Sequence, residues 1–253
     1  MASPVMSGRR LAAEPAQAVD VSIVVPTLNE AANVAPLCAA LDRALRAAGH
    51  AYEIVFVDGR SSDTTADNVR RLESETDGRV RLLAREDRCS LSAAVIDGFG
   101  AAASDVIVVM DADLQHPPEV VPRLLAAIAE GADVAVASRY AAGGDSELGW
   151  FRNLLSRFCT QLVRLSLGRR FHVSDPLSGF FAVRRSVVEN RNLAGSGFKV
   201  LMEVLACGDY REVREIPFRF VQRERGESKL GLHTALRDLL GLARAAREFR
   251  RRS

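Results

Sequence analysis

Short apolar runs alternate with longer amphipathic segments through the first 140 or so residues. The apolar runs predict strands at Val21–Val25, Tyr52–Val57, Arg79–Ala84, Val106–Met110 and Asp133–Ser138. The amphipathic segments predict helices at Ala31–Ala48, Asp63–Glu75, Leu91–Ala102 and Glu119–Glu130, the last of which begins just after Pro117 and Pro118. Strands that alternate with helices of this length indicate an α/β fold, with a mostly parallel, Rossmann-like sheet that helices cover on both faces.

The second half of the chain has a less regular pattern. It predicts a basic amphipathic helix at Phe151–Leu167, a short strand at Gly179–Arg184, a helix at Gly197–Ala206 and an edge strand at Val213–Val221. A C-terminal amphipathic helix follows at Leu230–Arg250, with leucines on one face and arginines on the other. We therefore predict a disordered tail at 1–18, a catalytic domain at 19–229 and a basic amphipathic helix at 230–253.

Ligands of open α/β sheets bind beyond the carboxyl ends of the strands. That rule directs attention to four loops that follow predicted strands. They are Pro26–Glu30, Asp58–Asp63, Asp111–His116 and Arg139–Gly144.

The loop after the fourth predicted strand has the strongest chemical pattern. Asp111 and Asp113 come directly after a run of apolar residues, and Gln115 follows two positions later. Carboxylate and amide oxygens at the end of a rigid strand suit Mg²⁺ or Mn²⁺, which proteins commonly share with substrate phosphates. The alternative is a helix cap and a turn with solvated acids. His116 precedes two prolines, and we interpret it as structural.

Composition limits the classes of partner. The net charge of +2 does not indicate a nucleic-acid-binding protein, but the segment from Arg211 to Ser253 holds 12 Lys/Arg against 6 Asp/Glu. This basic end suits an anionic partner such as a phosphate or a lipid surface. The four cysteines lie far apart and form no CxxC pair, so reduced thiols are expected rather than a zinc site or disulfides.

The sequence has no apolar run of the ~18–20 residues that span a bilayer, and no signal peptide is recognisable. We therefore expect a cytoplasmic protein. Any membrane contact is expected to be peripheral, at the cytoplasmic face, or to depend on a small membrane partner.

The segment Asp-Ala-Asp-Leu-Gln-His-Pro-Pro-Glu at 111–119 resembles the metal motif of family 2 glycosyltransferases with the GT-A fold. It is most similar to their dolichol-phosphate (polyprenol monophosphate) mannose synthase branch. Further segments resemble this family in the same order along the chain. They are 24–30, 57–58, 138–144, 175–181, 197–203 and 223–230, so that the resemblance covers about residues 20–232.

The resemblance implies a role for each matching residue. The residues implied to bind the nucleotide sugar are Pro26, Thr27, Asn29, Glu30, Asp58, Asp111, Asp113 and Gln115. The residues implied to bind the metal are Asp111, Asp113 and Gln115. Those implied to face the acceptor phosphate are Arg139, Arg152, Ser156, Arg225 and Lys229. Asp113, Arg139 and Lys229 are the implied catalytic residues.

The implied reaction transfers mannose from GDP-mannose to a polyprenyl (dolichyl) phosphate with inversion, and it uses Mg²⁺ or Mn²⁺. One alternative is a UDP-glucose-dependent polyprenyl-phosphate glucosyltransferase, and another is a catalytically weak scaffold subunit of a membrane complex. The alternatives arise because two segments depart from the family pattern. Gly59 and Arg60 stand where the family has Asp followed by Gly or Asn, and the loop Arg85–Ser92 has no glycine.

Overall fold

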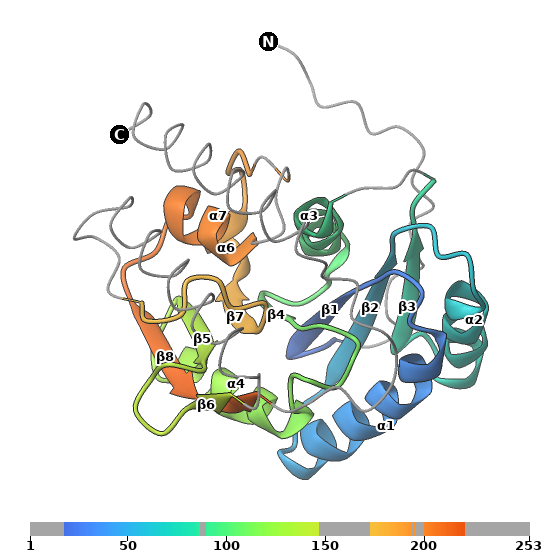
Figure 1. The fold of residues 1–253 in the computed structure, drawn as a ribbon, viewed down its shortest axis with the longest axis horizontal. Coiled ribbons are helices and arrows are strands. Elements are labelled where there is room, and N and C mark those ends of the chain that lie inside the picture. Colours follow the sequence, from blue (N-terminus) through green and yellow to red (C-terminus); the bar gives the residue numbers. More distant parts are fainter. Residues whose placement is uncertain (1–17, 87–89, 147–172, 194, 196–199, 221–253) are drawn as a thin grey trace.

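The computed structural model describes residues 18–86, 90–146, 173–193, 195 and 200–220 (Figure 1). The predicted helices at Phe151–Leu167 and Leu230–Arg250 lie outside the described residues, as does almost all of the predicted tail. The three-part division of the chain therefore stays a prediction. Within the described residues, no helix is long and apolar enough to cross a membrane.

The first part of the fold alternates strands and helices as the sequence predicts. The strands are β1 (Val21–Thr27), β2 (Tyr52–Asp58), β3 (Val80–Ala84), β4 (Val106–Val109) and β5 (Val134–Ser138). The helices between them are α1 (Ala31–Ala47), α2 (Thr65–Glu75), α3 (Leu91–Ala101) and α4 (Val121–Ala129), with the 3-10 turn η1 (Pro118–Val120) before α4. Most of these bounds agree with the prediction to within two residues.

The later elements are shorter. They are β6 (Asp145–Ser146), β7 (Phe181–Arg184), α6 (Arg185–Val188), α7 (Val200–Cys207), β8 (Val213–Pro217) and β9 (Arg219–Phe220). Seven strands form one sheet in the order β3-β2-β1-β4-β7-β5-β8, and β6 pairs with β9 in a small second sheet. All pairings in the large sheet are parallel except those of β7 with β4 and β5.

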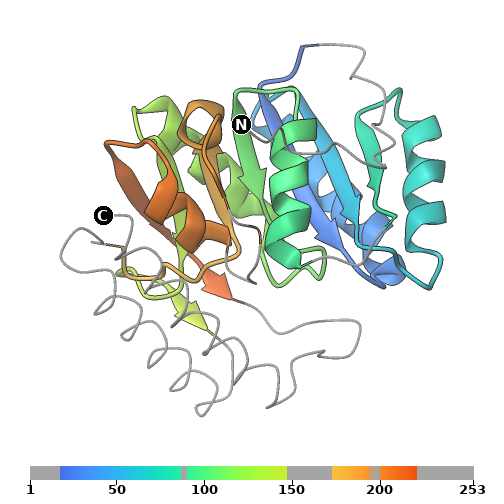
Figure 2. The ribbon, with the colours of Figure 1, turned by 90° about the horizontal axis from the view of Figure 1, so that it is seen from above.

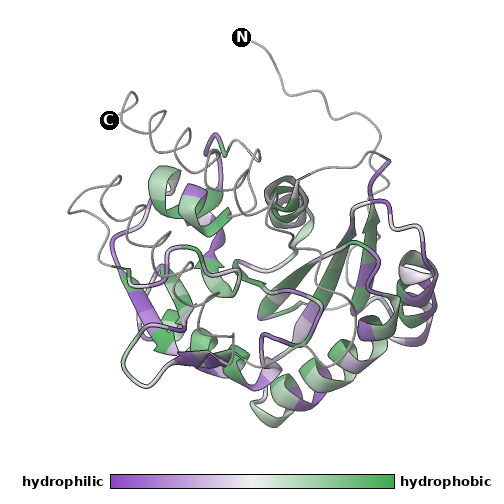
Figure 3. Ribbon diagram, viewed as in Figure 1, coloured by the Kyte–Doolittle hydropathy of each residue, from purple (hydrophilic) through white to green (hydrophobic). Residues whose placement is uncertain are grey.

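The two faces of the sheet bury separate apolar clusters, because successive residues of a strand point to opposite faces. On β1, Ile23 and Val25 pack with the cluster that includes α1, α2 and α4, whereas Val24 packs with α3, α6 and α7. Figure 2 shows α3 in front of the strands, and Figure 3 shows hydrophilic residues along β8 and on the outer side of α2. The prediction of a mostly parallel sheet covered on both faces is confirmed.

Two details of the prediction are wrong. Pro26 and Thr27 belong to β1 and not to the following loop, because the pairing of β1 with β2 continues to Thr27 and Asp58. The segment predicted as one edge strand forms two strands, β8 and β9, in different sheets. Its edge position is confirmed, since β8 is the last strand of the large sheet.

Candidate functional site

The sheet brings the predicted loops to one edge. β1, β2, β4 and β5 run in the same direction, so their carboxyl ends lie together, and the antiparallel β7 begins at that edge. The strand order also reverses at β1, which has β2 on one side and β4 on the other. Such a reversal is where open α/β sheets bind ligands. The carboxyl edge is therefore the candidate site.

β1 and β4 separate before they reach this edge. Their last paired residues are Val24 and Val109, and the Met110 N–H donates to the Val24 carbonyl at 3.2 Å. Pro26 lies beyond this last contact and has no N–H to offer a neighbouring strand. A proline is therefore tolerated in a central strand at this point.

The loops after β1 and β2 are joined by side-chain hydrogen bonds. The backbone N–H of Asn29 donates to the Ser61 hydroxyl at 2.8 Å, and the backbone N–H of Ser62 donates to Asn29 Oδ1 at 2.7 Å. The Ser62 hydroxyl donates to the same Asn29 oxygen at 3.2 Å. These contacts hold the two loops side by side, so Asn29 has a structural role whether or not it also meets a nucleotide.

Asp58 organises the turn after β2. It is buried, its Oδ2 accepts from the Ser61 N–H at 2.9 Å, and its Oδ1 accepts from the Ser61 hydroxyl at 2.5 Å. The Thr27 hydroxyl donates to Oδ1 at 3.3 Å. A carboxylate can accept about four hydrogen bonds, so these three contacts leave acceptor capacity on Asp58 for a further donor. The predicted contact of Asp58 with a nucleotide stays a prediction.

Glu30 and Asp63 lie just before the neighbouring helices α1 and α2. Glu30 Oε2 accepts from Asn33 Nδ2 at 2.7 Å, on the first turn of α1. Asp63 accepts from the Ala31 N–H with one oxygen and from the Thr65 N–H with the other, at 3.3 and 3.0 Å. Burial raises the pKa of Asp63, but the hydrogen bonds from Thr65 and Ala31 outweigh it, so that the pKa is lowered. Asp63 thus caps both α1 and α2, a role that the sequence analysis missed.

Backbone strain gathers at this edge. Asn29, Arg60 and Leu114 have φ values of 54°, 66° and 61°, one in each of the loops after β1, β2 and β4. Side chains other than glycine and asparagine seldom adopt such φ values, and residues that do so cluster at functional sites. The φ of Arg60 accounts for the Gly or Asn that the family pattern has at this position, since those residues adopt this conformation more readily than Arg.

The loop after β4 places the two acids differently. Asp113 is buried, and its Oδ1 accepts from the Gln115 N–H at 3.1 Å, across the strained Leu114. The Asp111 side chain is 41% exposed. Gly179, which precedes β7, faces Asp111, because a Cβ at Gly179 would lie 3.6 Å from Asp111 Oδ2. The strand β7 therefore brings a second segment against this loop.

The donors of this loop fit a hard divalent cation. Asp111 and Asp113 supply carboxylate oxygens and Gln115 supplies an amide oxygen, and such ligands suit Mg²⁺ and Mn²⁺. The described residues hold no cluster of three or more His, Cys, Asp or Glu that could surround a metal by itself. Two acids and an amide match a cation that completes its coordination with substrate oxygens, as Mg²⁺ commonly does.

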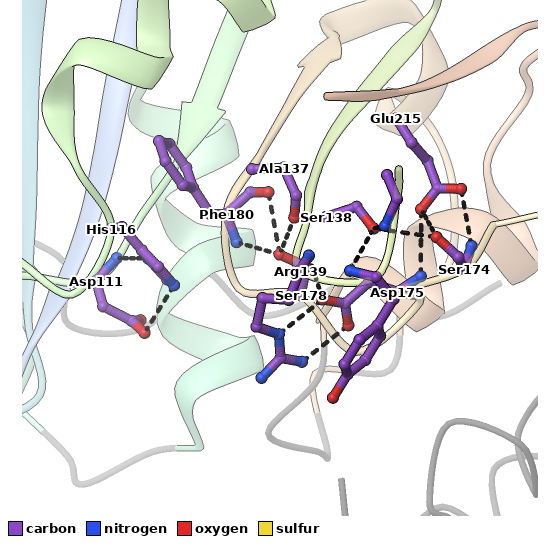
Figure 4. Close-up of polar contacts among 12 residues, drawn as sticks. Asp111, His116, Ala137, Ser138, Arg139, Ser174, Asp175, Ser178, Phe180 and Glu215 are labelled. Atoms are coloured by element: carbon purple, nitrogen blue, oxygen red, sulfur yellow. Dashed lines mark hydrogen bonds and ion pairs between the residues drawn. The ribbon is translucent and has the colours of Figure 1, made fainter. Parts of the chain in front are cut away.

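The His116 side chain packs against the start of the loop after β4, beside Asp111. Its Nδ1 accepts from the Asp111 N–H at 3.0 Å, and its Nε2 lies 3.7 Å from Asp111 Oδ2 (Figure 4). The ring stacks on Phe180 with centroids 5.0 Å apart and meets Phe218 and Phe220 edge-on. The side chain is buried, so its interpretation as structural agrees with this environment.

Arg139, after β5, forms a bidentate ion pair with Asp175. Its Nε and one terminal nitrogen donate to the two Asp175 oxygens at 2.7 and 2.8 Å, and its backbone N–H donates at 3.2 Å (Figure 4). Asp175 is fully buried, and the Arg139 side chain is 12% exposed. Burial lowers the pKa of Arg139, and Asp175 more than offsets this, so the guanidinium stays charged.

A second acid supports this ion pair from β8. Glu215 accepts from the Ser174 N–H at 2.9 Å, from the Ser174 hydroxyl at 2.5 Å and from the Asp175 N–H at 3.3 Å. It thereby fixes the backbone that carries Asp175. The sequence analysis missed Ser174 and Glu215, and the only signal was an acid within an alternating strand pattern.

Arg85 and Glu203 have local partners. Arg85, at the start of the glycine-free loop, pairs with Asp97 of α3. Glu203 of α7 accepts from the Gly195 N–H at 2.9 Å. Glu203 therefore has a backbone partner and serves as a paired acid of this helix.

The described residues therefore bring together Pro26, Thr27, Asn29, Glu30, Asp58, Asp111, Asp113, Gln115 and Arg139 at one edge of the sheet. The other residues predicted to face an acceptor lie outside the described residues. They are Arg152, Ser156, Arg225 and Lys229. The roles assigned to all of these residues stay predictions.

Fold and site together define an open α/β protein with a polar ligand-binding edge at a strand-order reversal. Known proteins specify the class further. The sequence profile described as glycosyl transferase family 2 matches residues 22–191, and the chain belongs to this family.

Two named relatives are similar over most of this chain. A Pyrococcus furiosus protein named dolichol-phosphate mannosyltransferase is 47% identical over 212 residues, which cover 83% of this chain and 59% of the relative. A Saccharomyces cerevisiae protein of the same name is 35% identical over 224 residues, which cover 84% and 81%. The chain thus spans less than two thirds of the Pyrococcus relative.

A solved structure agrees in fold. The crystal structure of glucosyl-3-phosphoglycerate synthase from Mycobacterium tuberculosis, in complex with Mn²⁺, UDP and glucosyl-3-phosphoglycerate, has a TM-score of 0.63. The match covers 90% of this chain and 80% of that one at 20% identity. The fold of this chain is accordingly of the GT-A type.

Proposed function

We propose that this chain transfers mannose from GDP-mannose to a polyprenyl phosphate, with inversion at the anomeric carbon. The observation that carries the proposal is the 47% identity to the Pyrococcus furiosus dolichol-phosphate mannosyltransferase across 83% of this chain. The acidic loop after β4 supports it, because it offers oxygen donors beside the reversal in strand order.

In this proposal Asp111, Asp113 and Gln115 hold Mg²⁺ or Mn²⁺ together with the diphosphate of the nucleotide sugar. The bound cation would act as a Lewis acid that offsets the charge of the departing diphosphate. The manganese in the glucosyl-3-phosphoglycerate synthase structure, which shares the fold, is consistent with such a group. Pro26, Thr27, Asn29, Glu30 and Asp58 are proposed to face the nucleoside.

The acceptor is a phosphate monoester with a second pKa near ~6, and it is therefore largely ionised at pH 7. It needs positioning and charge neutralisation more than a general base. A phosphate oxygen forms the new bond to the anomeric carbon, while the bond from that carbon to the diphosphate breaks on the opposite face and GDP leaves. Attack from the opposite face inverts the configuration.

Arg139 is proposed to orient the acceptor phosphate, with Arg152, Ser156, Arg225 and Lys229 from segments outside the described residues. Its bidentate contact with Asp175 fixes the plane of the guanidinium. An arginine has five N–H donors, so a guanidinium held in this way can still offer donors to a phosphate. The charge of Asp175 also moderates the positive potential of Arg139.

The turn after β2 bears on which nucleotide base the donor carries. Arg60 occupies the strained position of the turn after β2, next to the loop that carries Asn29. Its charge and its size differ from the Gly or Asn that the family pattern has there. A UDP-glucose-dependent polyprenyl-phosphate glucosyltransferase is therefore the second candidate.

We further propose that the protein works at the cytoplasmic face of a membrane, where a polyprenyl phosphate presents its headgroup. Contact would be peripheral, through the basic segment 230–253, or through a small membrane partner. The excess of Lys/Arg from Arg211 to Ser253 supports an approach to anionic headgroups.

The test is transfer of a radiolabelled sugar. The full chain is incubated with Mn²⁺ or Mg²⁺, a polyprenyl phosphate in membranes, and labelled GDP-mannose or UDP-glucose in parallel reactions. The proposal expects label in the lipid phase from GDP-mannose alone. Label from UDP-glucose alone would establish the second candidate. Absence of label from any nucleotide sugar would contradict enzymatic activity and favour a scaffold subunit of a membrane complex.

A further inference from the structure

His116 contacts Asp111 at two points. Its Nδ1 accepts from the Asp111 backbone N–H at 3.0 Å, while its Nε2 lies 3.7 Å from the Asp111 carboxylate oxygen Oδ2 (Figure 4). A backbone N–H can only donate, so Nδ1 must use its lone pair in this contact and cannot carry a proton. The proton of the neutral imidazole is therefore on Nε2, the nitrogen that faces the carboxylate.

This arrangement leaves His116 unsuited to bind a metal directly. Its Nδ1 lone pair is occupied, and its Nε2 carries the proton. The ring also has no net charge in this tautomer. A cationic neighbour would neutralise the acids and compete with a divalent ion, whereas a neutral imidazole leaves the charge of Asp111 in place.

The ring itself is held by aromatic side chains from distant parts of the chain. Phe180 stacks on it at 5.0 Å with an interplanar angle of 19°, and Phe218 and Phe220 contact it at 72° and 70°. Phe180 directly precedes β7, Phe218 directly follows β8, and Phe220 is the last residue of β9. The position of Asp111 is thereby tied to three elements of the fold through one imidazole.

We propose that His116 is a positioning residue that fixes the backbone of Asp111, and with it the place of its carboxylate, for cation binding, without serving as a ligand. This inference rests on the proposed function, because it assumes that the loop after β4 binds a divalent cation. Groups that orient metal ligands typically change metal affinity by 10–100-fold when they are removed. A role in core packing alone would affect folding but would not depend on the ring nitrogens.

Two matched pairs of side chains at position 116 separate these roles. His and Phe both fill the aromatic site, but only His has an acceptor for the Asp111 N–H. Asn and Leu have the same branching, but only His116→Asn keeps an acceptor, Oδ1, attached to Cγ as Nδ1 is. His116→Phe is therefore expected to bind Mn²⁺ about tenfold more weakly than wild type. His116→Leu is expected to bind Mn²⁺ about tenfold more weakly than His116→Asn.

Equilibrium dialysis of Mn²⁺ measures this affinity without turnover. The full chain is placed in one chamber, and both chambers contain the same concentration of GDP. The Mn²⁺ in the protein chamber above that in the other chamber is then the Mn²⁺ bound to the protein. Circular dichroism confirms that each variant is folded. His50→Asn, at the opposite edge before β2, is a control that should bind Mn²⁺ as wild type does.

The order of affinities decides the outcome. Weaker binding in both variants that lack the acceptor supports the inference, and the Asn–Leu pair decides alone if His116→Phe does not fold. Affinities that follow the presence of the ring, with Phe equal to wild type and Asn equal to Leu, would overturn it and leave a packing role. Failure of the wild-type protein to bind Mn²⁺ would overturn the inference together with the proposed cation site. Affinities that follow the presence of the ring would overturn the inference alone and leave the proposed function standing.

Discussion

At the amino edge of the sheet, Glu53 on β2 meets Arg81 on β3, whereas at the carboxyl edge Asp111 and Asp113 follow β4. The Glu53 and Arg81 side chains are 0% and 5% exposed, and their charged atoms lie 2.5 Å apart. Glu53 also accepts from the Ala103 N–H at 2.6 Å. A cation, the Ser22 hydroxyl and one backbone N–H from the protein itself thus satisfy this acid.

The acids at the carboxyl edge have different surroundings. The carboxylate of Asp111 remains 41% exposed and faces a neutral imidazole, and Asp113 accepts from a backbone N–H. The contrast teaches that burial of an acid does not by itself mark a functional site. The paired acid at the amino edge serves stability, whereas the acids at the carboxyl edge stand where we propose that a cation binds.

The largest expected effect is that of Asp113→Ala on transfer. Removal of this carboxylate should lower the transfer rate at least about 10⁴-fold, equivalent to ~5.4 kcal/mol, because the departing diphosphate loses its stabilisation. The free energy of unfolding should change by less than about 1 kcal/mol, since one hydrogen bond to Gln115 is lost. Radiolabel transfer and urea denaturation measure the two quantities, and full activity in this variant would remove the proposed role of Asp113.

Arg81→Ala should have the opposite profile. It leaves Glu53 buried without its cation, which typically costs about 3–5 kcal/mol of stability. The Kd for Mn²⁺ of the folded protein should stay within about twofold of wild type, because the two edges lie at opposite ends of the strands. The double variant Glu53→Gln, Arg81→Met should recover part of the lost stability. A clear loss of Mn²⁺ affinity in folded Arg81→Ala would break the comparison between the edges.

Arg139→Lys tests a third charged region, the ion pair of Arg139 with Asp175. Its acid is buried and paired like Glu53, but it lies at the carboxyl edge like Asp111. Lysine keeps the positive charge but cannot span both oxygens of Asp175 as a planar guanidinium does. We expect the KM for polyprenyl phosphate to rise about tenfold, or ~1.4 kcal/mol, with an unchanged KM for the nucleotide sugar. Steady-state kinetics with each substrate varied in turn will show this. A rise in the KM of the nucleotide sugar alone would assign Arg139 to the donor.

The smallest expected effect concerns Asp63, which caps α1 and α2 beside the site. Its pKa is lowered from the ordinary value of 3.8, so its contribution to stability is present above that value and is lost as the pH falls through the folded-state pKa. Asp63→Asn should cost about 1 kcal/mol at pH 7. The difference from wild type should narrow as the pH falls below 3.8.

Urea denaturation followed by circular dichroism at several pH values measures this difference. Asp67→Asn is the control, because Asp67 forms an exposed pair with Arg70 that is worth well under about 1 kcal/mol. A gap between wild type and Asp63→Asn that is constant with pH would show that the charge of Asp63 is not involved.

The sequence predicted the first five strands and the helices between them because apolar periodicity is a local signal. The place of β7 between β4 and β5, antiparallel to both, could not be predicted in this way. Gly179–Arg184 was predicted as a strand, but its neighbours are set by long-range packing. This single topological feature brings Asp175 and Gly179 to the carboxyl edge.

The candidate site was predicted in part. Asp111, Asp113 and Gln115 could be selected because they follow a buried strand within a short motif. The contacts around His116 could not, since Phe180, Phe218 and Phe220 are far away in sequence. The support of Asp175 by Glu215 likewise depends on the pairing of β8 with β5.

Anomalous diffraction from crystals of the full chain grown with GDP and Mn²⁺ tests the central claim most directly. The account predicts an anomalous peak between the diphosphate and the carboxylates of Asp111 and Asp113, at Mn–O distances of about 2.0–2.3 Å. Well-ordered GDP without manganese at these acids, or manganese bound at a different place, would contradict it.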